Sequence, residues 1–372
     1  MTDSSTTSCA SRKPARRASR PSRSSWTGRW GGIDFVAGVY RFEEDGANVQ
    51  DPTVFLGVRG AFELAQQLDS AAVFASVGTE PGSRWQLAGG VRSTRDRKRA
   101  TTDVGTEPVS AERRWRETSW EIAAHYALGD RMAAYATVQN GYQSGQFPAR
   151  PYCLFVDPDC FTAGDNITAL NYEIGVKGQP VDGLELSAAV FRTRCVDLPY
   201  QVSSTAGAGF SSVNLIVGQW TTGFESESTL YVMRRFRVHA ALGWLNVKVE
   251  PQGGVRPVAP LTPELTLSLS PEYRCWLGNG SGITARLDYS YRSGMWGEPR
   301  SDPGRLTRVG GRGLVNFHVG YEASDGAWTV AVYGRNVLDR RYDNARLNTG
   351  DYLLRILSND ASEFVVRVER RF

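Results

Sequence analysis

Hydrophobic and polar residues alternate along much of this chain, most regularly toward its C-terminus. The odd positions of 283–291 are apolar or aromatic, whereas the even positions are polar and include Arg286 and Asp288. Segments 261–273 and 327–336 alternate in the same way. Because successive side chains of a strand point to opposite faces, this period predicts strands rather than helices. The charged rows would suit a water-filled lumen, since a sandwich core does not accept unpartnered charges.

The last residues, SEFVVRVERRF, continue the alternation, with only Arg370 interrupting the apolar row. A last strand with one apolar face and a terminal aromatic residue is typical of an outer-membrane barrel. Such a strand must pair with a neighbour and face lipid on one side. One face of this predicted C-terminal barrel strand carries Phe364, Val366, Val368 and Phe372, and the other carries Glu363, Arg367, Glu369 and Arg371.

Residues that favour tight turns separate pairs of alternating segments. The pairs Gly129-Asp130, Asp182-Gly183 and Asp325-Gly326, and the triplet at 278–280, provide residues that tolerate positive φ. Short turns alternating with long polar loops are typical of outer-membrane barrels. We therefore predict an all-β fold, an antiparallel transmembrane β-barrel of about 15 strands with short periplasmic turns and long extracellular loops. The predicted loops are 92–113, 142–170, 200–212, 250–261, 292–312 and 339–361.

Composition agrees with a strand-rich protein and argues against other classes. Of the 372 residues, 41% are hydrophobic, and the mean hydropathy is -0.35. We find no run of about 18 apolar residues, which a spanning helix would need. The 39 Gly, 10 Trp and 15 Tyr residues suit turns and interfacial aromatic belts. A net charge of +4 is too small to indicate nucleic acid as a partner.

The N-terminal segment 1–25 differs from the rest, because it is rich in Ser and Arg and lacks an apolar run. No secretory signal peptide is visible in it. We expect 1–25 to be disordered or to lie outside the native reading frame; a basic tail that binds anionic lipid or nucleic acid is an alternative. Segment 26–372 would form the barrel domain.

The cysteines and histidines do not form a metal motif. Cys153 and Cys160 enclose the segment CLFVDPDC and could form a loop disulfide, which would suit the cell surface; two free thiols are the alternative. His125, His239 and His318 are isolated in separate strand-like segments. We predict no metal site, no cofactor and no catalytic residue. No Gly-x-Ser-x-Gly motif or phosphate-binding loop is present either.

Several segments resemble the TonB-dependent outer-membrane receptors, which import iron-siderophores and similar scarce nutrients. The most specific is NYEIGVKGQPVDGLELSAAVF (171–191), a Tyr-Glu-x-Gly-x-Lys strand, a tight turn and an Ala-Val-Phe strand. YATVQNGYQSGQF (135–147), GFESEST (223–229) and GAWTVAVYGRNVLDRRY (326–342) are also similar to segments of the family. The resemblance extends from about residue 26 to the C-terminus, and Asn336 and Asp339 would have a structural role at a strand end.

The resemblance implies a siderophore-receptor barrel in the outer membrane of a Gram-negative bacterium. Only its C-terminal part would be present, about 15 of about 22 strands, with the plug and the first strands missing. The implied partners are outer-membrane lipid, an iron-siderophore or similar ligand, and the barrel-assembly machinery through the C-terminal strand. The TonB complex is expected only for an intact receptor. Two alternatives remain, a non-functional receptor fragment and a passive porin-like channel.

Aromatic and arginine residues in the predicted loops are the candidate ligand contacts. Such side chains can stack on catecholate groups or pair with carboxylates. The candidates are Tyr142, Phe147, Arg150, Tyr152 and Trp296.

Overall fold

The protein is almost entirely β-structure in a computed structural model that describes residues 16–50, 62–103, 107–148, 154, 158–204, 211–254, 256–299, 306–348, 353–358 and 360–371. Fifteen strands form one sheet, in which β12 pairs with β15 and β16 with β19 and all others follow chain order. The described residues contain no helix long and apolar enough to cross a membrane. The prediction of an antiparallel, all-β fold is confirmed. The sheet strands are β1 (Arg16–Trp30), β2 (Ile33–Gln50), β3 (Phe62–Thr79), β4 (Trp85–Asp103), β5 (Val109–Ala127), β6 (Met132–Gln143), β7 (Ile167–Val181), β8 (Leu184–Ser204), β9 (Ser211–Met233), β10 (Phe236–Val249), β11 (Leu265–Trp276), β12 (Gly282–Arg292), β15 (Arg312–Glu322), β16 (Trp328–Arg335) and β19 (Glu363–Arg370).

Among the described residues, two short hairpins and the 3₁₀ turn η2 lie outside this sheet. They are β13 (Met295–Trp296) with β14 (Arg308–Val309), β17 (Asp343–Asn348) with β18 (Leu353–Leu357), and η2 (Pro158–Cys160). The chain divides into two compact units. The first comprises Met1–Thr79, Gly89–Trp120 and Gly141–Ile167, and the second comprises Glu80–Ala88, Glu121–Asn140 and Thr168–Phe372.

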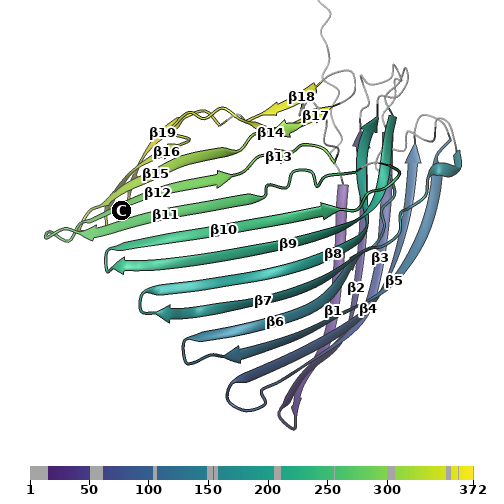
Figure 1. Ribbon diagram of the computed structural model, residues 1–372, viewed down its shortest axis with the longest axis horizontal. Coiled ribbons are helices and arrows are strands. Elements are labelled where there is room, and N and C mark those ends of the chain that lie inside the picture. Colours follow the sequence, from purple (N-terminus) through teal and green to yellow (C-terminus); the bar gives the residue numbers. More distant parts are fainter. Residues whose placement is uncertain are drawn as a thin grey trace, which may run out of the picture. The chain divides into compact units, whose positions relative to one another are not determined.

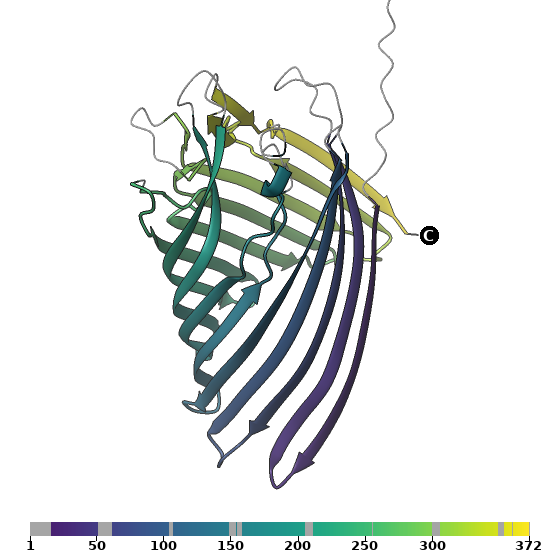
Figure 2. The same ribbon diagram turned by 90° about the vertical axis from the view of Figure 1, so that its right-hand side faces the viewer.

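Tight turns alternate with longer connections, as predicted. In the first unit, β1 and β2 are long neighbouring strands joined through Gly31 and Gly32 (Figure 2). In the second unit, Gly183 joins β7 to β8 with a φ of 79°, and Gly326 joins β15 to β16 with a φ of 67°. Residues with a Cβ rarely adopt these values, so the turns require glycine. In the second unit β9 to β12, β15, β16 and β19 run side by side (Figure 1).

The C-terminal strands separate apolar and polar residues onto opposite faces. Val366 and Val368 on β19 are directly paired with Val332 and Val330 on β16. At 66% and 60% exposed, Val366 and Val368 belong to a face that no described segment covers. An apolar face left open along paired strands is what contact with hydrocarbon requires. Phe364 lies on the same face, and Phe372 is outside the described residues.

Several parts of the sequence-based prediction differ from the structure. Within the predicted loop 200–212, β8 continues to Ser204 and β9 begins at Ser211. The predicted loop 92–113 is wrong, because β4 continues to Asp103 and β5 begins at Val109. Ion pairs of Arg97 and Arg99 with Glu112, at 2.6 and 2.7 Å, tie the two polar strand ends together without an apolar row. Within the segment 1–25 expected to be disordered, residues 16–25 form strand, because their backbone pairs with β2. Residues 1–15 are outside the described residues.

The hairpin of β17 and β18 is held by a buried carboxylate. Asp343 is 6% exposed and accepts hydrogen bonds from Arg346 and from Arg355, whose Nη2 lies 3.0 Å from Oδ1. Burial by itself raises the pKa of Asp343, but the hydrogen bonds from Arg355 and Arg346 outweigh it and hold the pKa below the ordinary value of 3.8. The hairpin therefore depends on an ionised Asp343. It lies beside β14, at one end of the strands of the second unit (Figure 1).

We predict that the amides of the β17–β18 hairpin stay protected from hydrogen exchange from neutral pH down to about pH 4. At lower pH, where carboxyl groups become protonated, this protection should be lost. The pKa of Asp343 is lower in the folded hairpin than in the unfolded chain. The ionised carboxylate therefore stabilises the hairpin at pH values above the unfolded-state pKa, and this stabilisation is lost as the pH falls through the folded-state pKa. Asp343→Asn removes the charge at all pH values and should cost about 1–3 kcal/mol locally. Hydrogen exchange of the amides of 345–347 at pH 7 and pH 3 measures both effects. Equal exchange in Asp343→Asn and the parent at pH 7 would contradict this prediction.

Candidate functional site

Strand register places a row of functional side chains across the polar face of the second unit. Arg286 on β12 is paired with His318 on β15, and His318 is paired with Tyr333 on β16. Tyr333 is paired with Val365 on β19, and Arg367 lies two residues further along the same face. Directly opposed residues in antiparallel strands point to one face, so pairing alone brings residues 286 and 367 to one surface.

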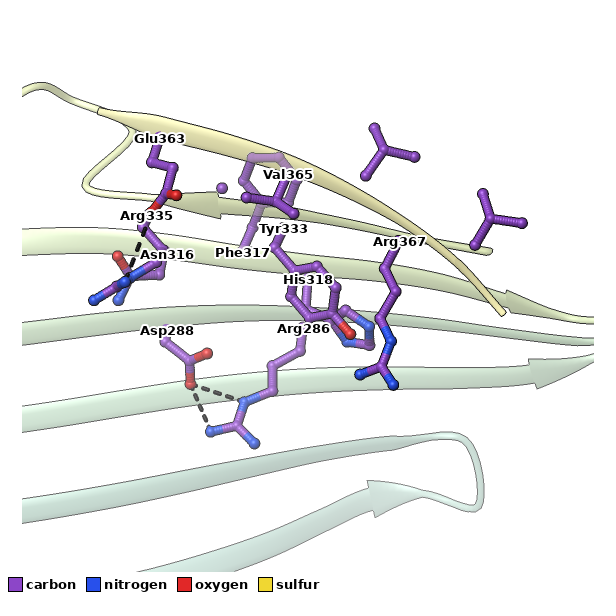
Figure 3. Close-up of a pocket in the computed structure, with 13 residues that line it drawn as sticks. Arg286, Asp288, Asn316, Phe317, His318, Tyr333, Arg335, Glu363, Val365 and Arg367 are labelled. Carbon is purple, nitrogen blue, oxygen red and sulfur yellow. Dashed lines mark hydrogen bonds and ion pairs between the residues drawn. The ribbon is translucent and has the colours of Figure 1, made fainter. Parts of the chain in front are cut away.

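A cavity of about 880 Å³ lies over this row. Figure 3 shows Arg286, Arg335 and Arg367 around the rings of His318 and Tyr333. The two rings stack with centroids 4.7 Å apart. We call this space the wall cavity.

The lining of the wall cavity combines charged side chains with aromatic and valine side chains. Arg286 Nε donates to Asp288 Oδ1 at 2.8 Å, and Arg335 Nη1 lies 3.6 Å from Glu363 Oε2. Arg367 Nη2 donates to Glu369 Oε2 at 3.0 Å. The described residues of the lining include three arginines against two carboxylates and contain no serine, cysteine or lysine. The cavity therefore offers hydrogen-bonding and cationic groups for a polar or anionic ligand.

A second cavity of about 510 Å³ shares Asn316, Arg335 and Glu363 with the first. Asn336, 3% exposed, organises the turn beside it. Its Nδ2 donates to the main-chain oxygens of Arg340 and Asp360, at 3.1 and 2.6 Å, while its Oδ1 accepts from Arg340 N.

Asn336 and Asp339 have the structural role that was predicted for them. Both have positive φ, 44° and 43°, and Asp339 Oδ1 accepts the main-chain N–H of Ser362 at 3.1 Å. Their side chains thus satisfy the backbone where β16 leads into the segment before β19.

The first unit contains a buried cluster formed by the β6–β7 connection (residues 144–166) on β4 and β5. Lys98 is 7% exposed, and its Nζ donates to the main-chain oxygens of Ser144 and Gly145 at 3.1 and 2.8 Å. The same ammonium group lies 5.5 Å from the ring centroid of Trp115. Since a buried ammonium group must use its donors, Lys98 fixes the connection to the face of β4.

Further contacts hold the other end of the connection. Trp115 Nε1 donates to Gly164 O at 3.2 Å, and Arg113 donates to Ala163 O and Asp165. Asn166 Nδ2 donates to Glu117 Oε2 at 3.1 Å. A buried apolar cluster lies between the two ends and comprises Leu64, Ala100, Trp115, Phe147, Phe161 and Ala163.

The structure brings two of the predicted ligand contacts into the first unit. Phe147 is 3% exposed and stacks on Phe161 with centroids 5.3 Å apart, so it has a packing role in this state. Tyr142, at the end of β6, donates to Asp96 Oδ2 at 3.0 Å and is half-buried. Arg150 and Tyr152 are outside the described residues.

Trp296, the remaining candidate, belongs to the second unit. It lies in β13, paired with Arg308 on β14, and the Arg308 guanidinium carbon is 5.6 Å from its ring centroid. Of the described candidates, two thus lie in the first unit and one in the second, and their role as ligand contacts stays a prediction.

The cysteine and histidine side chains have separate environments. Cys160 is disulfide-bonded, Cys195 and Cys275 are free, and Cys153 lies outside the described residues. The 153–160 pairing thus stays a prediction. His125 stacks on Tyr135 with centroids 5.8 Å apart. No group of three metal-ligating side chains occurs in the described parts of the chain.

Sequence reasoning missed the buried residues of β4. Asp96, Lys98 and Thr102 alternate with exposed positions inside a segment that was predicted to be a loop. The available signal was the recurrence of arginine at 95, 97 and 99, which has the period of a strand.

The chain matches the family described as TonB dependent receptor-like, beta-barrel, over residues 7–337. It therefore belongs to this family. Its class is that of outer-membrane receptor barrels, and the resemblance noted from its motifs is confirmed. No functionally curated protein matches the sequence.

Solved structures of the same fold include iron and copper transport proteins. The ferric yersiniabactin uptake receptor FyuA of Yersinia pestis is 18% identical, with a TM-score of 0.75, and 96% of this chain covers 54% of it. The ferric-catecholate import receptor Fiu of E. coli K12 is 17% identical, with a TM-score of 0.70, and the match covers 96% of this chain and 55% of Fiu. The copper transporter OprC is 15% identical, with a TM-score of 0.73, and the match covers 96% of this chain and 57% of OprC. The chain thus spans just over half the length of these structures.

We predict that Lys98→Met releases the β6–β7 connection. The substitution retains an unbranched side chain but leaves two main-chain oxygens without their donor, at a cost of about 1–3 kcal/mol. Limited proteolysis should then cut within 144–166 at a rate at least several-fold higher. Arg95→Met is the matched control, because Arg95 is an exposed residue of the same strand. Equal cleavage rates in the two variants would show that Lys98 does not hold the connection.

Proposed function

We propose that the chain is the barrel portion of an outer-membrane receptor that takes up a ferric siderophore or a similar scarce nutrient. The family match over residues 7–337 is the observation that carries this proposal. The named activities of FyuA and Fiu, ferric yersiniabactin uptake and ferric-catecholate import, support an iron chelate as the ligand. OprC, a copper transporter, supports the broader class of metal-containing nutrients.

The wall cavity supports a polar, anionic cargo. Arg286, Arg335 and Arg367 can donate several charge-assisted hydrogen bonds to oxygen atoms of a chelate. The stacked rings of His318 and Tyr333 provide an aromatic surface beside these donors. Each of these interactions can break and form again with another atom of the ligand, which suits a wall along which a ligand passes.

The proposed partners follow from the same assignment. Outer-membrane lipid would contact the apolar face of β19, including Val366 and Val368. The barrel-assembly machinery would recognise the C-terminal strand, and the TonB complex would supply energy in an intact receptor. The proposed location is the outer membrane of a Gram-negative bacterium.

An uptake experiment tests the function. The chain, exported by a fused signal peptide, would be expressed in a strain lacking its own siderophore receptors, with and without TonB. Growth on ferric chelates as the only iron source that requires TonB would support active uptake by the chain. Equal growth in the two strains would indicate a passive channel. No growth, with the chain folded in the outer membrane, would indicate a fragment without transport activity.

A pair of neighbouring substitutions tests insertion in lipid. Val366→Arg places a charge on the apolar face of β19 and should cost about 2–4 kcal/mol of folding into vesicles. Val365→Arg places the same charge on the polar face, where it should cost much less. Resistance of the folded form to protease in phosphatidylcholine vesicles reports the folded fraction. Similar losses in both variants would argue against a lipid-facing side at Val366.

A further inference from the structure

Two arginines face each other at the ends of adjacent strands in the second unit. Arg292 is the last residue of β12, and its register partner is Arg312, the first residue of β15. Like charges directly opposite each other in a sheet destabilise the pair. The fold therefore holds two guanidinium groups together against their repulsion.

The contacts of these two side chains are with uncharged groups. Arg292 Nη2 donates to the main-chain oxygen of Asp343 at 3.4 Å. Arg312 Nη1 donates to Asn344 Oδ1 at 3.0 Å, and the guanidinium carbon of Arg312 lies 3.8 Å from the ring centroid of Tyr342. Among the described residues, neither arginine forms a direct ion pair with a carboxylate.

The nearby carboxylates are already engaged. The Asp343 side chain accepts hydrogen bonds from Arg346 and Arg355. The Asp360 carboxylate accepts the hydroxyl of Tyr342. The Asp343 carboxylate is therefore already paired with two cations. The Asp360 carboxylate accepts a neutral hydroxyl and keeps its charge, and the hydrogen bond from Tyr342 and, to a smaller extent, the charge of Arg312 lower its pKa.

One donor of the pair is enclosed without an acceptor. Arg292 Nη1 is buried and has no hydrogen-bond partner among the described groups. An unused charged donor away from water is costly, because it loses hydration without compensation. Together with the opposed charges, this donor indicates that an acceptor from outside the described chain completes the site.

We propose that Arg292 and Arg312 form a binding site for one oxyanion group, a carboxylate or a phosphate, of the transported ligand. A guanidinium group matches both oxyanions with paired hydrogen bonds, and two adjacent guanidinium groups favour a group of full negative charge. The ring of Tyr342 holds Arg312 in place, and the start of β17 holds Arg292. The identification of the anion as part of a transported ligand rests on the proposed function; the site itself does not.

Calorimetric titration of the full chain, folded in detergent micelles at low ionic strength, tests the site. The probes are citrate and inorganic phosphate, which distinguish the two oxyanion classes. We expect the parent to bind at least one probe, and Arg312→Gln and Arg292→Gln each to weaken it about tenfold or more. Arg341→Gln, which removes a nearby arginine that is paired with Asp339 at 3.3 Å, should bind like the parent.

Thermal unfolding provides a second measurement, in which the unfolding temperature is compared with and without the anion. Without anion, Arg312→Gln should unfold at the same or a higher temperature than the parent, because it relieves repulsion. The probe should raise the unfolding temperature of the parent and not that of Arg312→Gln.

The proposal is overturned if the parent binds neither probe, or if all three variants bind equally. Equal weakening by Arg341→Gln would also overturn it, because binding would then reflect net charge. The uptake experiment is independent. The chain could bind an oxyanion through Arg292 and Arg312 and yet show no transport. That result would support the site and contradict the proposed function. Uptake unaffected by Arg312→Gln would show that the bound oxyanion is not part of the transported ligand, and would leave the function in place.

Discussion

Hydrogen bonding between neighbouring antiparallel strands is the constraint on which the rest of this structure depends. In a sheet that crosses a bilayer, every backbone N–H and C=O must find its partner in the next strand, since hydrocarbon offers none. Pairing fixes register, and register fixes which side chains share a face. Val332 and Val366 are neighbours on the apolar face for this reason. Arg286, His318 and Tyr333 are neighbours on the polar face for the same reason.

The charged side chains discussed above have three kinds of environment. Most are paired within the sheet, as Arg237 is with Glu272 at 2.9 Å. Lys98 is buried against main-chain oxygens and has a structural role. Arg292 and Arg312 are opposed to each other and lack a carboxylate among the described residues. The last arrangement is the one that opposes two like charges and leaves a buried donor of Arg292 without an acceptor, and we therefore take it to indicate an external anion.

The connections between strands carry the local differences in stability. The β6–β7 connection in the first unit is fixed by Lys98 and by an apolar cluster. The β17–β18 hairpin in the second unit is fixed by one carboxylate, Asp343, between two arginines. A receptor needs connections that hold a defined shape but can rearrange when a ligand arrives. Interactions of this kind can be broken one at a time, without loss of the sheet.

The sequence by itself determined the fold class, the family and the faces of the C-terminal strands. Period-two alternation is a local property, and it was readable in 283–291 and at Val366 and Val368. The roles of Asn336 and Asp339 were readable too, because side chains that satisfy a turning backbone act over a few residues. The length of β4 could not be read from apolar alternation, because ion pairs of Arg97 and Arg99 with Glu112 replace an apolar row there.

Only the tertiary structure decided the sites. The wall cavity joins residues of four strands, and the arginine pair joins residues 20 positions apart through the register of β12 and β15. Phe147 was a candidate ligand contact by sequence, yet its burial against Phe161 depends on how the β6–β7 connection folds back. The physical reason is common to all three. A composition or a period identifies which side of a strand a residue occupies, but contacts between strands depend on pairing across long sequence separations.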